Sequence, residues 1–168
     1  MADYVTVEAF ESIARELAAD GIRFMVVGGL AVQAHGYDRV TYDIDLVIQL
    51  QPQNVVDAFV ALQRVGYHPA VPITASQFAD PAMRQRFRDE KGMVVLNFWS
   101  DRFKSTKLDV FVAEPFEFDA EYEMALVDRS IIGVELRFPR VAALLAMKRL
   151  ANRPKDQNDI LFLESLDR

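Results

Sequence analysis

The sequence has no cysteine and only two histidines in 168 residues. Without cysteine, the chain has no disulfides, no thiolate metal site and no cysteine nucleophile. The two histidines, His35 and His68, are far apart in the sequence, so a histidine-based zinc site is not expected. The Walker A sequence, the serine elbow and the dinucleotide-binding glycine fingerprint are absent as well. These absences exclude several common routes to catalysis and nucleotide binding.

Long hydrophobic runs and a surplus of basic residues are also missing. No apolar run approaches a membrane span, and the N-terminus lacks the layout of a signal peptide, so we expect a cytoplasmic protein without a membrane partner. The formal charge of −6 argues against a broad nucleic-acid-binding surface. We interpret two basic clusters, 84–88 and 104–107, as solvated faces. A chain of 168 residues is most economically one domain, spanning residues 1–168.

The most informative feature is a pair of glycines followed by a strand with two acidic residues. An apolar strand runs into Gly28 and Gly29, which open a short helix, and the next strand carries Asp43 and Asp45. Alternate residues of a strand point the same way, so the two carboxylates should stand side by side, roughly 7 Å apart. Neighbouring carboxylates repel unless one is protonated or a cation lies between them. Oxygen ligands of this kind suit Mg²⁺, which completes its coordination with water and substrate phosphates.

The residues before the acidic pair extend the same pattern. Arg39 and Thr41 share the parity of Asp43 and Asp45, so an extended segment would place a guanidinium and a hydroxyl on the same face. The glycines let the backbone approach a ligand, and the helix start offers unpaired N–H groups and a positive dipole end to phosphate. We interpret the whole as a cradle for a triphosphate and a metal ion.

A third carboxylate interrupts a later apolar strand. Asp109 lies within Lys-Leu-Asp-Val-Phe-Val at 107–112, where burial of an unpaired carboxylate would be costly. Taken alone, it is best explained as a surface-facing residue on an edge strand. Beside Asp43 and Asp45, it supplies the third carboxylate that two-metal phosphoryl transfer requires, to bind a metal and accept a proton from the attacking hydroxyl.

The helix expected over 140–151 has an apolar stripe that leads to Lys148. This lysine is either a snorkelling side chain near a helix C-terminus or a ligand of the triphosphate, and the residues alone leave both interpretations open. Further on, Lys155 and Asp159 are spaced to pair across one helical turn.

Hydrophobic patterning predicts the remaining elements. Helices are expected over 6–20, 29–35, 52–65, 81–89, 140–151 and 154–166, and strands over 24–27, 43–48, 93–99 and 108–112. Residues 131–136 are expected to form another strand or a bent hairpin strand before Pro139. Prolines interrupt the region 68–91, so we expect a surface excursion there in which only 81–89 is helical.

These residues resemble the nucleotidyltransferase superfamily of the polymerase-β type. Its pattern is a Gly-Gly or Gly-Ser turn, a helix, Asp-x-Asp on a strand and a third Asp on a later strand. The longer runs at 28–36 (Gly-Gly-Leu-Ala-Val-Gln-Ala-His-Gly) and 153–159 (Arg-Pro-Lys-Asp-Gln-Asn-Asp) are similar to the AbiEii-like branch, which includes toxins of toxin–antitoxin and phage-defence systems. The resemblance covers most of the chain, although segment 66–105 adds nothing to it.

The resemblance implies an α/β (α+β) nucleotidyltransferase fold, with a small mixed sheet flanked by helices and further helices at the C-terminus. It implies that Gly28 and Gly29 hold an NTP. Asp43 and Asp45 would bind Mg²⁺, and Asp109 would complete the metal and catalytic site. The further nucleotide-binding candidates are Arg39, Thr41, Lys148 and Arg153.

The expected reaction transfers NMP from an NTP to an acceptor hydroxyl and releases pyrophosphate. The toxin resemblance points to RNA, such as the end of a tRNA, as the acceptor and to an antitoxin protein as a partner. Transfer to a small molecule such as an antibiotic, or to a protein hydroxyl, is an alternative. A catalytically degenerate module that only binds a nucleotide or a partner is another.

Overall fold

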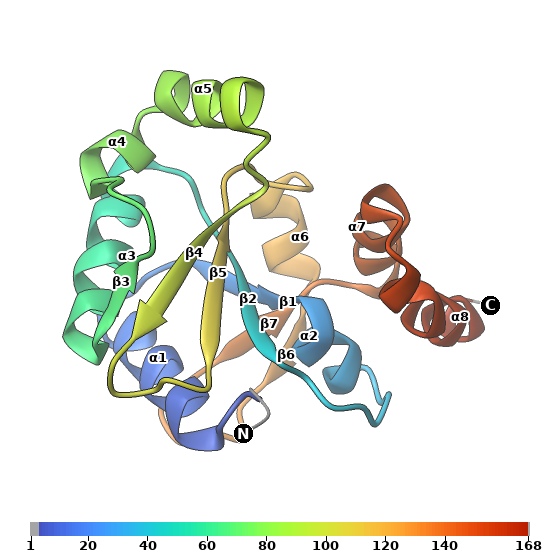
Figure 1. The fold of residues 1–168 in the computed structure, drawn as a ribbon. Coiled ribbons are helices and arrows are strands. Elements are labelled where there is room, and N and C mark those ends of the chain that lie inside the picture. Colours follow the sequence, from blue (N-terminus) through green and yellow to red (C-terminus); the bar gives the residue numbers. More distant parts are fainter. Residues whose placement is uncertain (1–3, 168) are drawn as a thin grey trace.

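The structure, a computed structural model, describes residues 4–167 and is built on a five-stranded sheet. Its strand order is β1-β2-β5-β4-β3, in which β2 and β5 run parallel and the other neighbours run antiparallel. The strands are β1 (Phe24–Val27), β2 (Asp43–Ile48), β3 (Tyr67–Pro69), β4 (Val95–Ser100) and β5 (Lys107–Phe111). Helices surround this sheet (Figure 1). The mixed sheet flanked by helices confirms the fold class expected from the sequence.

Helices α1 (Val7–Ala19) and α3 (Pro52–Val65) form the main core with one face of the sheet. Thr6 begins α1 by accepting a hydrogen bond from the Ala9 N–H, and Pro52 is the first residue of α3, where its missing N–H is not needed. Phe59 of α3 packs against Phe98 of β4 with ring centroids 5.4 Å apart. The buried strand residues on this face include Ile44, Leu46, Leu96, Phe98, Leu108 and Val110.

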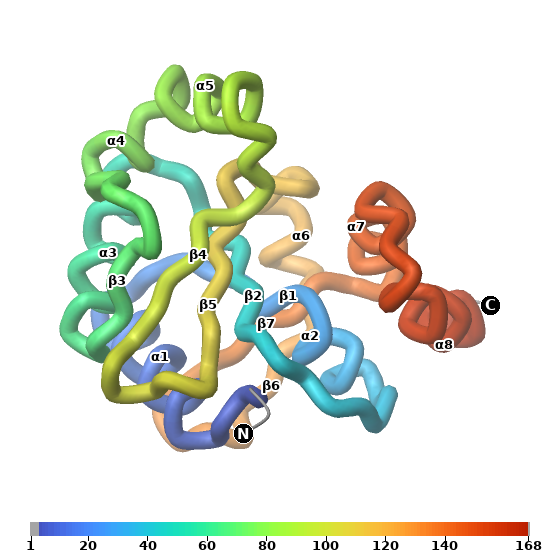
Figure 2. The backbone as a smooth tube through the Cα atoms, viewed as in Figure 1, coloured from blue at the N-terminus to red at the C-terminus, as the bar shows by residue number. Residues whose placement is uncertain are grey.

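The remaining helices and a hairpin frame the rest of the sheet. Helix α2 (Gly28–Ala34) follows β1 directly, and strands β6 (Leu126–Asp128) and β7 (Leu136–Phe138) pair as a hairpin. The C-terminal α7 (Val141–Ala151), the 3-10 turn η1 (Pro154–Asp156) and α8 (Gln157–Leu166) lie to one side of the sheet (Figures 1 and 2). Tyr37, after α2, stacks on Phe162 of α8 with centroids 4.9 Å apart, so the α2–β2 segment contacts the C-terminal helices.

The region 68–91 differs from the predicted surface excursion. Residues 67–69 form β3, an edge strand of the sheet, and a short helix α4 (Ala75–Ala79) precedes α5 (Pro81–Lys91). Phe78 of α4 is completely buried, and Thr74 begins this helix with a capping box. Pro69 is compatible with a strand because it lies at the end of an edge strand. The prolines therefore mark element boundaries inside the fold.

The strand or bent hairpin strand predicted over 131–136 forms only at its end. Residues 131–133 form a turn, in which Gly133 has a φ of +79°, and only Leu136–Phe138 is a strand. Helix α6 (Phe118–Met124), which the patterning did not predict, precedes the hairpin. Among residues 4–167, no helix has both the length and the apolar character needed to cross a bilayer.

Candidate functional site

Three carboxylates lie on one face of the two parallel central strands. Asp45 of β2 is the direct neighbour of Asp109 of β5, and Asp43 lies two residues before Asp45. Side chains two residues apart on a strand, and directly opposite across neighbouring strands, point the same way. The structure therefore brings together the three acidic residues that the sequence singled out.

The glycine turn lies against Asp45. Val27, the last residue of β1, is opposite Asp45, and Gly28 begins α2 with a φ of +66°. A Cβ atom on Gly28 would lie only 2.1 Å from the Asp45 Oδ2. Glycine is thus required at position 28 for two reasons: the backbone is left-handed there, and the Asp45 carboxylate occupies the space that a Cβ would fill.

Arg39 and Thr41 lie beside the turn, in the segment before β2, which begins at Asp43 as predicted. Thr41 is buried against Gly29, and its hydroxyl has no hydrogen-bond partner within the described part of the chain. A buried hydroxyl without a partner is costly. Arg39 pairs with Asp159 of α8. The turn is therefore lined by one unsatisfied hydroxyl and one cation that is already held by a carboxylate.

Burial and neighbouring carboxylates raise the pKa values of Asp45 and Asp109. Burial, and then the charges of Asp109 and Asp43, raise the pKa of Asp45 from 3.8 to about 7. Burial, and then the nearby Asp43, also raise the pKa of Asp109, although a hydrogen bond from Asn97 acts in the opposite direction. The protein thus holds negative charges close together without compensating them fully, which is typical of a site that receives a cation.

Asn97 is a site residue that the sequence reasoning missed. It lies opposite Asp109 in the β4–β5 pairing, and its Nδ2 donates a 2.6 Å hydrogen bond to the Asp109 Oδ1. This contact fixes the orientation of the Asp109 carboxylate. The available signal was the same as for Asp109, a polar residue within an apolar strand, Val-Leu-Asn-Phe-Trp at 95–99.

The predicted cations of the C-terminal helices form a buried ion-pair network. The Lys148 Nζ lies 3.0 Å from the Asp156 Oδ1 and 2.8 Å from the Asp159 Oδ2, and Arg153 binds Asp156 at 2.7 Å. The predicted pairing of Lys155 with Asp159 is not what forms, because Asp159 pairs with Lys148 and Arg39 instead.

This network also faces the carboxylate site. The positive charges of Arg153 and Lys148 lower the pKa of Asp45, against the larger effects of burial and the other carboxylates. Burial alone would raise the pKa of Asp156, but hydrogen bonds from Arg153 and Lys148 outweigh it, and this pKa is lowered. Both interpretations of Lys148 therefore remain compatible with its position: a buried structural cation that lies near the predicted triphosphate.

Replacing Lys148 by methionine should destabilise the fold by about 3–5 kcal/mol, because Asp156 and Asp159 would lose a buried partner. The matched control is Arg149→Met. This neighbouring cation pairs with Glu164 on the exposed surface, where such a pair contributes about 1 kcal/mol or less. Urea denaturation of the two variants checks the difference. Equal losses in the two would mean that the network around Lys148 contributes no more than a surface pair.

Comparison with known proteins agrees with this geometry. The sequence profile of the family described as "Nucleotidyl transferase of unknown function (DUF2204)" matches residues 6–166. The chain belongs to this family. Membership confirms the nucleotidyltransferase resemblance drawn from Gly28, Gly29 and the three aspartates, while the narrower AbiEii-like assignment stays a prediction. No curated protein matches the chain in sequence.

Two solved structures are similar to this nucleotidyltransferase. The lincosamide antibiotic adenylyltransferase LnuA, with lincomycin bound, aligns with a TM-score of 0.62 at 14% identity and covers 96% of this chain and 98% of that one. An antigenic nucleotidyltransferase-like protein from Paracoccidioides brasiliensis aligns with a TM-score of 0.56 at 17% identity, covering 97% and 78%. At these identities the likeness concerns the fold.

The donors of the site fit Mg²⁺ provided that the substrate completes its coordination. Within residues 4–167, no three His, Asp or Glu side chains are gathered tightly enough to enclose a metal ion by themselves. Mg²⁺ bound at phosphate-transfer sites commonly takes one or two carboxylates and fills its remaining positions with phosphate oxygens and water. Asp43 and Asp45 offer that partial set of oxygen ligands on one strand.

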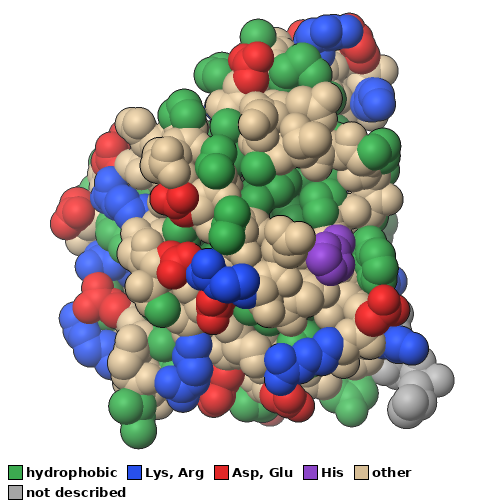
Figure 3. Space-filling view, turned by 90° about the vertical axis from the view of Figure 1, so that its left-hand side faces the viewer, with side chains coloured by type: hydrophobic (Ala, Val, Ile, Leu, Met, Phe, Trp, Pro, Cys, Tyr) green, Lys and Arg blue, Asp and Glu red, His purple; other side chains and the backbone are tan. Residues whose placement is uncertain are grey.

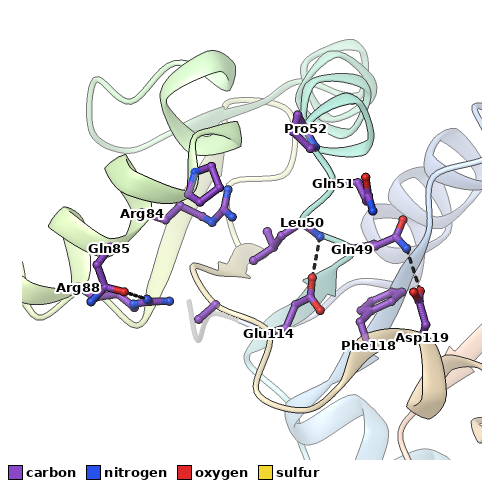
Figure 4. Close-up of a pocket in the computed structure, with 12 residues that line it drawn as sticks. Gln49, Leu50, Gln51, Pro52, Arg84, Gln85, Arg88, Glu114, Phe118 and Asp119 are labelled. Atoms are coloured by element: carbon purple, nitrogen blue, oxygen red, sulfur yellow. Dashed lines mark hydrogen bonds between the residues drawn. The ribbon is translucent and has the colours of Figure 1, made fainter.

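A separate cavity of about 620 Å³ lies at the other end of β2, between α5 and α6 (Figure 4). Arg84 points from α5 toward the β2–α3 segment, and Glu114 accepts a 3.0 Å hydrogen bond from the Leu50 N–H across the floor. Arg84 is buried, so the solvated face predicted for it is wrong, and burial together with the nearby Arg88 lowers its pKa. None of the predicted site residues lines this cavity.

Proposed function

We propose that this nucleotidyltransferase transfers NMP from a Mg²⁺-bound NTP to an acceptor hydroxyl at the site formed by Asp43, Asp45 and Asp109. The observation that carries the proposal is the register of β2 and β5, which sets Asp45 beside Asp109 directly under the Gly28 turn. The acceptor oxygen forms a bond to the α-phosphorus, the bond from that phosphorus to the β-phosphate bridge breaks, and pyrophosphate leaves.

Each residue has a role that follows from its place. The Gly28–Gly29 turn lets the triphosphate approach the backbone, and the Thr41 hydroxyl beside it offers an unpaired polar group to a ligand. Asp43 and Asp45 would hold Mg²⁺, which when bound neutralises phosphate charge and orients the triphosphate. Asp109, oriented by Asn97 and with a raised pKa, accepts the proton of the attacking hydroxyl.

A small molecule is the acceptor that the observations favour. The likeness to LnuA, bound to lincomycin, extends over nearly the whole of both chains, which supports an acceptor of that size. The formal charge of −6 gives little support to an extended RNA-binding surface. On the one face that Figure 3 shows, acidic and basic side chains are mixed. RNA, together with a toxin role and an antitoxin partner, rests on the AbiEii-like resemblance alone.

The proposal is tested by incubating the protein with Mg²⁺ and each α-labelled NTP in the presence of total RNA, total protein or a small-metabolite extract. The double variant Asp43→Ala/Asp45→Ala is the control. We expect label in the small-metabolite fraction, dependent on Mg²⁺ and lost in the control. Clear NTP binding by titration calorimetry without label in any fraction would instead support the degenerate binding module.

A further inference from the structure

The face of the sheet that carries the three aspartates continues onto β4 and β3. Asn97 of β4 lies opposite Asp109, and Trp99 follows it by two residues, so both side chains point to the face of the carboxylates. His68 of the edge strand β3 is directly opposite Trp99 and therefore points the same way. The catalytic face thus extends from the carboxylates to an aromatic pair, Trp99 and His68, which we call the aromatic platform.

Within the platform, Trp99 is exposed to solvent and His68 is half-buried. Trp99 is the only tryptophan of the sequence and is 46% exposed, and its ring centroid lies 5.6 Å from that of His68 at an interplanar angle of 49°. The opposite face of the same strand carries Phe98, which is buried under α3. Strand β4 therefore buries Phe98 in the core and presents the Trp99 ring on the catalytic face, where no core residue covers it.

The spacing between platform and carboxylates matches a small ring compound. Trp99 lies one strand across and two residues along from Asp109, which corresponds to roughly 8 Å between their Cα atoms. A ring stacked on Trp99 then needs only a short arm, or a substituent on the ring itself, to bring a hydroxyl within reach of the Asp109 carboxylate. A long or flexible linker between ring and hydroxyl would carry the oxygen past the site.

We propose that the aromatic platform binds the acceptor, and that this acceptor is a small molecule whose reacting hydroxyl lies on, or within a few bonds of, a flat ring. The inference rests on the proposed function. The ring stacks on Trp99, the hydroxyl oxygen forms its bond to the α-phosphorus, the proton passes to Asp109, and pyrophosphate is the leaving group. Trp99 and His68 set specificity and position the acceptor, while Asp109 and Asn97 remain the residues next to the reacting atoms.

A nucleotide base at the end of an RNA also presents a ring near a hydroxyl, but it brings phosphates with it. Binding of a nucleic-acid strand normally combines stacking with a positively charged groove along the backbone. The formal charge of −6 gives little support to an extended groove of this kind, although single cations such as Arg153 and Lys148 lie near the carboxylates. A small molecule without a phosphate backbone is the better match for the platform.

The test compares wild type with Trp99→Ala and Trp99→Phe, using dilutions of a small-metabolite extract as acceptor and an α-labelled NTP with Mg²⁺. Leu150→Ala is the control for loss of an exposed apolar side chain, since Leu150 is 87% exposed on α7. Because loss of one stacked ring weakens binding by roughly tenfold or more, transfer at low extract concentration should fall by that factor in Trp99→Ala. Trp99→Phe should retain most of the transfer, and Leu150→Ala all of it.

Without extract, water can replace the acceptor and slowly release pyrophosphate from the NTP. The rate of this reaction reports on the nucleotide site and should be the same in all four proteins. Full transfer by Trp99→Ala would overturn the platform while leaving the proposed function intact. When wild type is also given total RNA and total protein, label entering RNA alone would overturn the acceptor class. Absence of transfer by wild type into every fraction would defeat the proposed function itself and the platform with it. The extract should also quench the fluorescence of the single tryptophan saturably, and dialysis of the extract, which removes small molecules, should abolish this quenching. That would be an independent positive result.

Discussion

Asp45→Asn should make the metal-free protein more stable at pH 8 while removing transfer. In the folded protein the pKa of Asp45 is raised to about 7 by burial, Asp109 and Asp43, so ionising this group opposes folding. The folded state binds the Asp45 proton more tightly than the unfolded state does, so the protonated carboxyl contributes its full stabilisation of the fold at low pH. This stabilisation is lost as the pH rises from about 4, the pKa in the unfolded chain, to about 7, the pKa in the folded protein. Asparagine fills the same space without the charge.

The gain from Asp45→Asn should therefore grow over that pH interval and level off above pH 7, reaching up to about 4 kcal/mol at 1.36 kcal/mol per pKa unit. Urea denaturation in EDTA at pH 5 and pH 8 measures it. Asp101→Asn, at an exposed position after β4, is the control for removal of one acidic residue. A variant less stable than wild type at pH 8 would contradict the charge repulsion that we derive for the site.

Gly28→Ala should separate activity from stability. The Cβ of alanine would lie 2.1 Å from the Asp45 Oδ2, so this carboxylate has to rotate away. The closest atoms belong to the carboxylate group, which can rotate, while the Asp45 Cβ at 3.1 Å has to shift only slightly. The unfolding free energy should therefore fall mainly by the left-handed backbone cost, roughly 1–2 kcal/mol. Transfer should fall by about 100-fold or more, because misplacing a catalytic group by about 1 Å can have that effect.

Gly21→Ala is the matched control for Gly28→Ala. Gly21 has a φ of +67°, nearly the same as the +66° of Gly28, but a Cβ there would meet no atom within 4 Å. The two variants thus share the backbone cost and differ in the contact with Asp45. Similar unfolding free energies with transfer lost only in Gly28→Ala are the expected pair of results. Transfer retained by Gly28→Ala would show that the position of Asp45 under this turn is not needed.

The central strands and their acidic residues could be predicted from the sequence because local signals were strong there. Strands 24–27 and 43–48 and the helix 52–65 have the bounds expected, since apolar runs, Pro52 and Gly66 mark their ends. The identity of the strand that carries Asp109 was also predictable. That Asp45 and Asp109 are direct neighbours depends on the sheet order, which no local pattern reports.

The parts that sequence patterning missed depend on tertiary contacts. Arg84 lies in a basic run that suggests solvent, yet it is buried and donates to the Phe78 carbonyl oxygen at 2.6 Å. Lys148 finds its partners in Asp156 and Asp159, after a break between helices that changes the spacing of a simple helical pair. Asn97 and Trp99 could be placed on the face of the carboxylates only once the pairing of β4 with β5 was known.

The most direct test of the central claim follows the fate of two labels in the same NTP. Wild-type protein with Mg²⁺ and the active acceptor fraction receives NTP labelled either at the α-phosphate or at the γ-phosphate. Nucleotidyl transfer by the three aspartates predicts that the α-label enters the acceptor and the γ-label leaves as pyrophosphate, and that Asp45→Asn abolishes both. A γ-label in the acceptor, or α-label transfer that survives in Asp45→Asn, would contradict the reaction and the site proposed here.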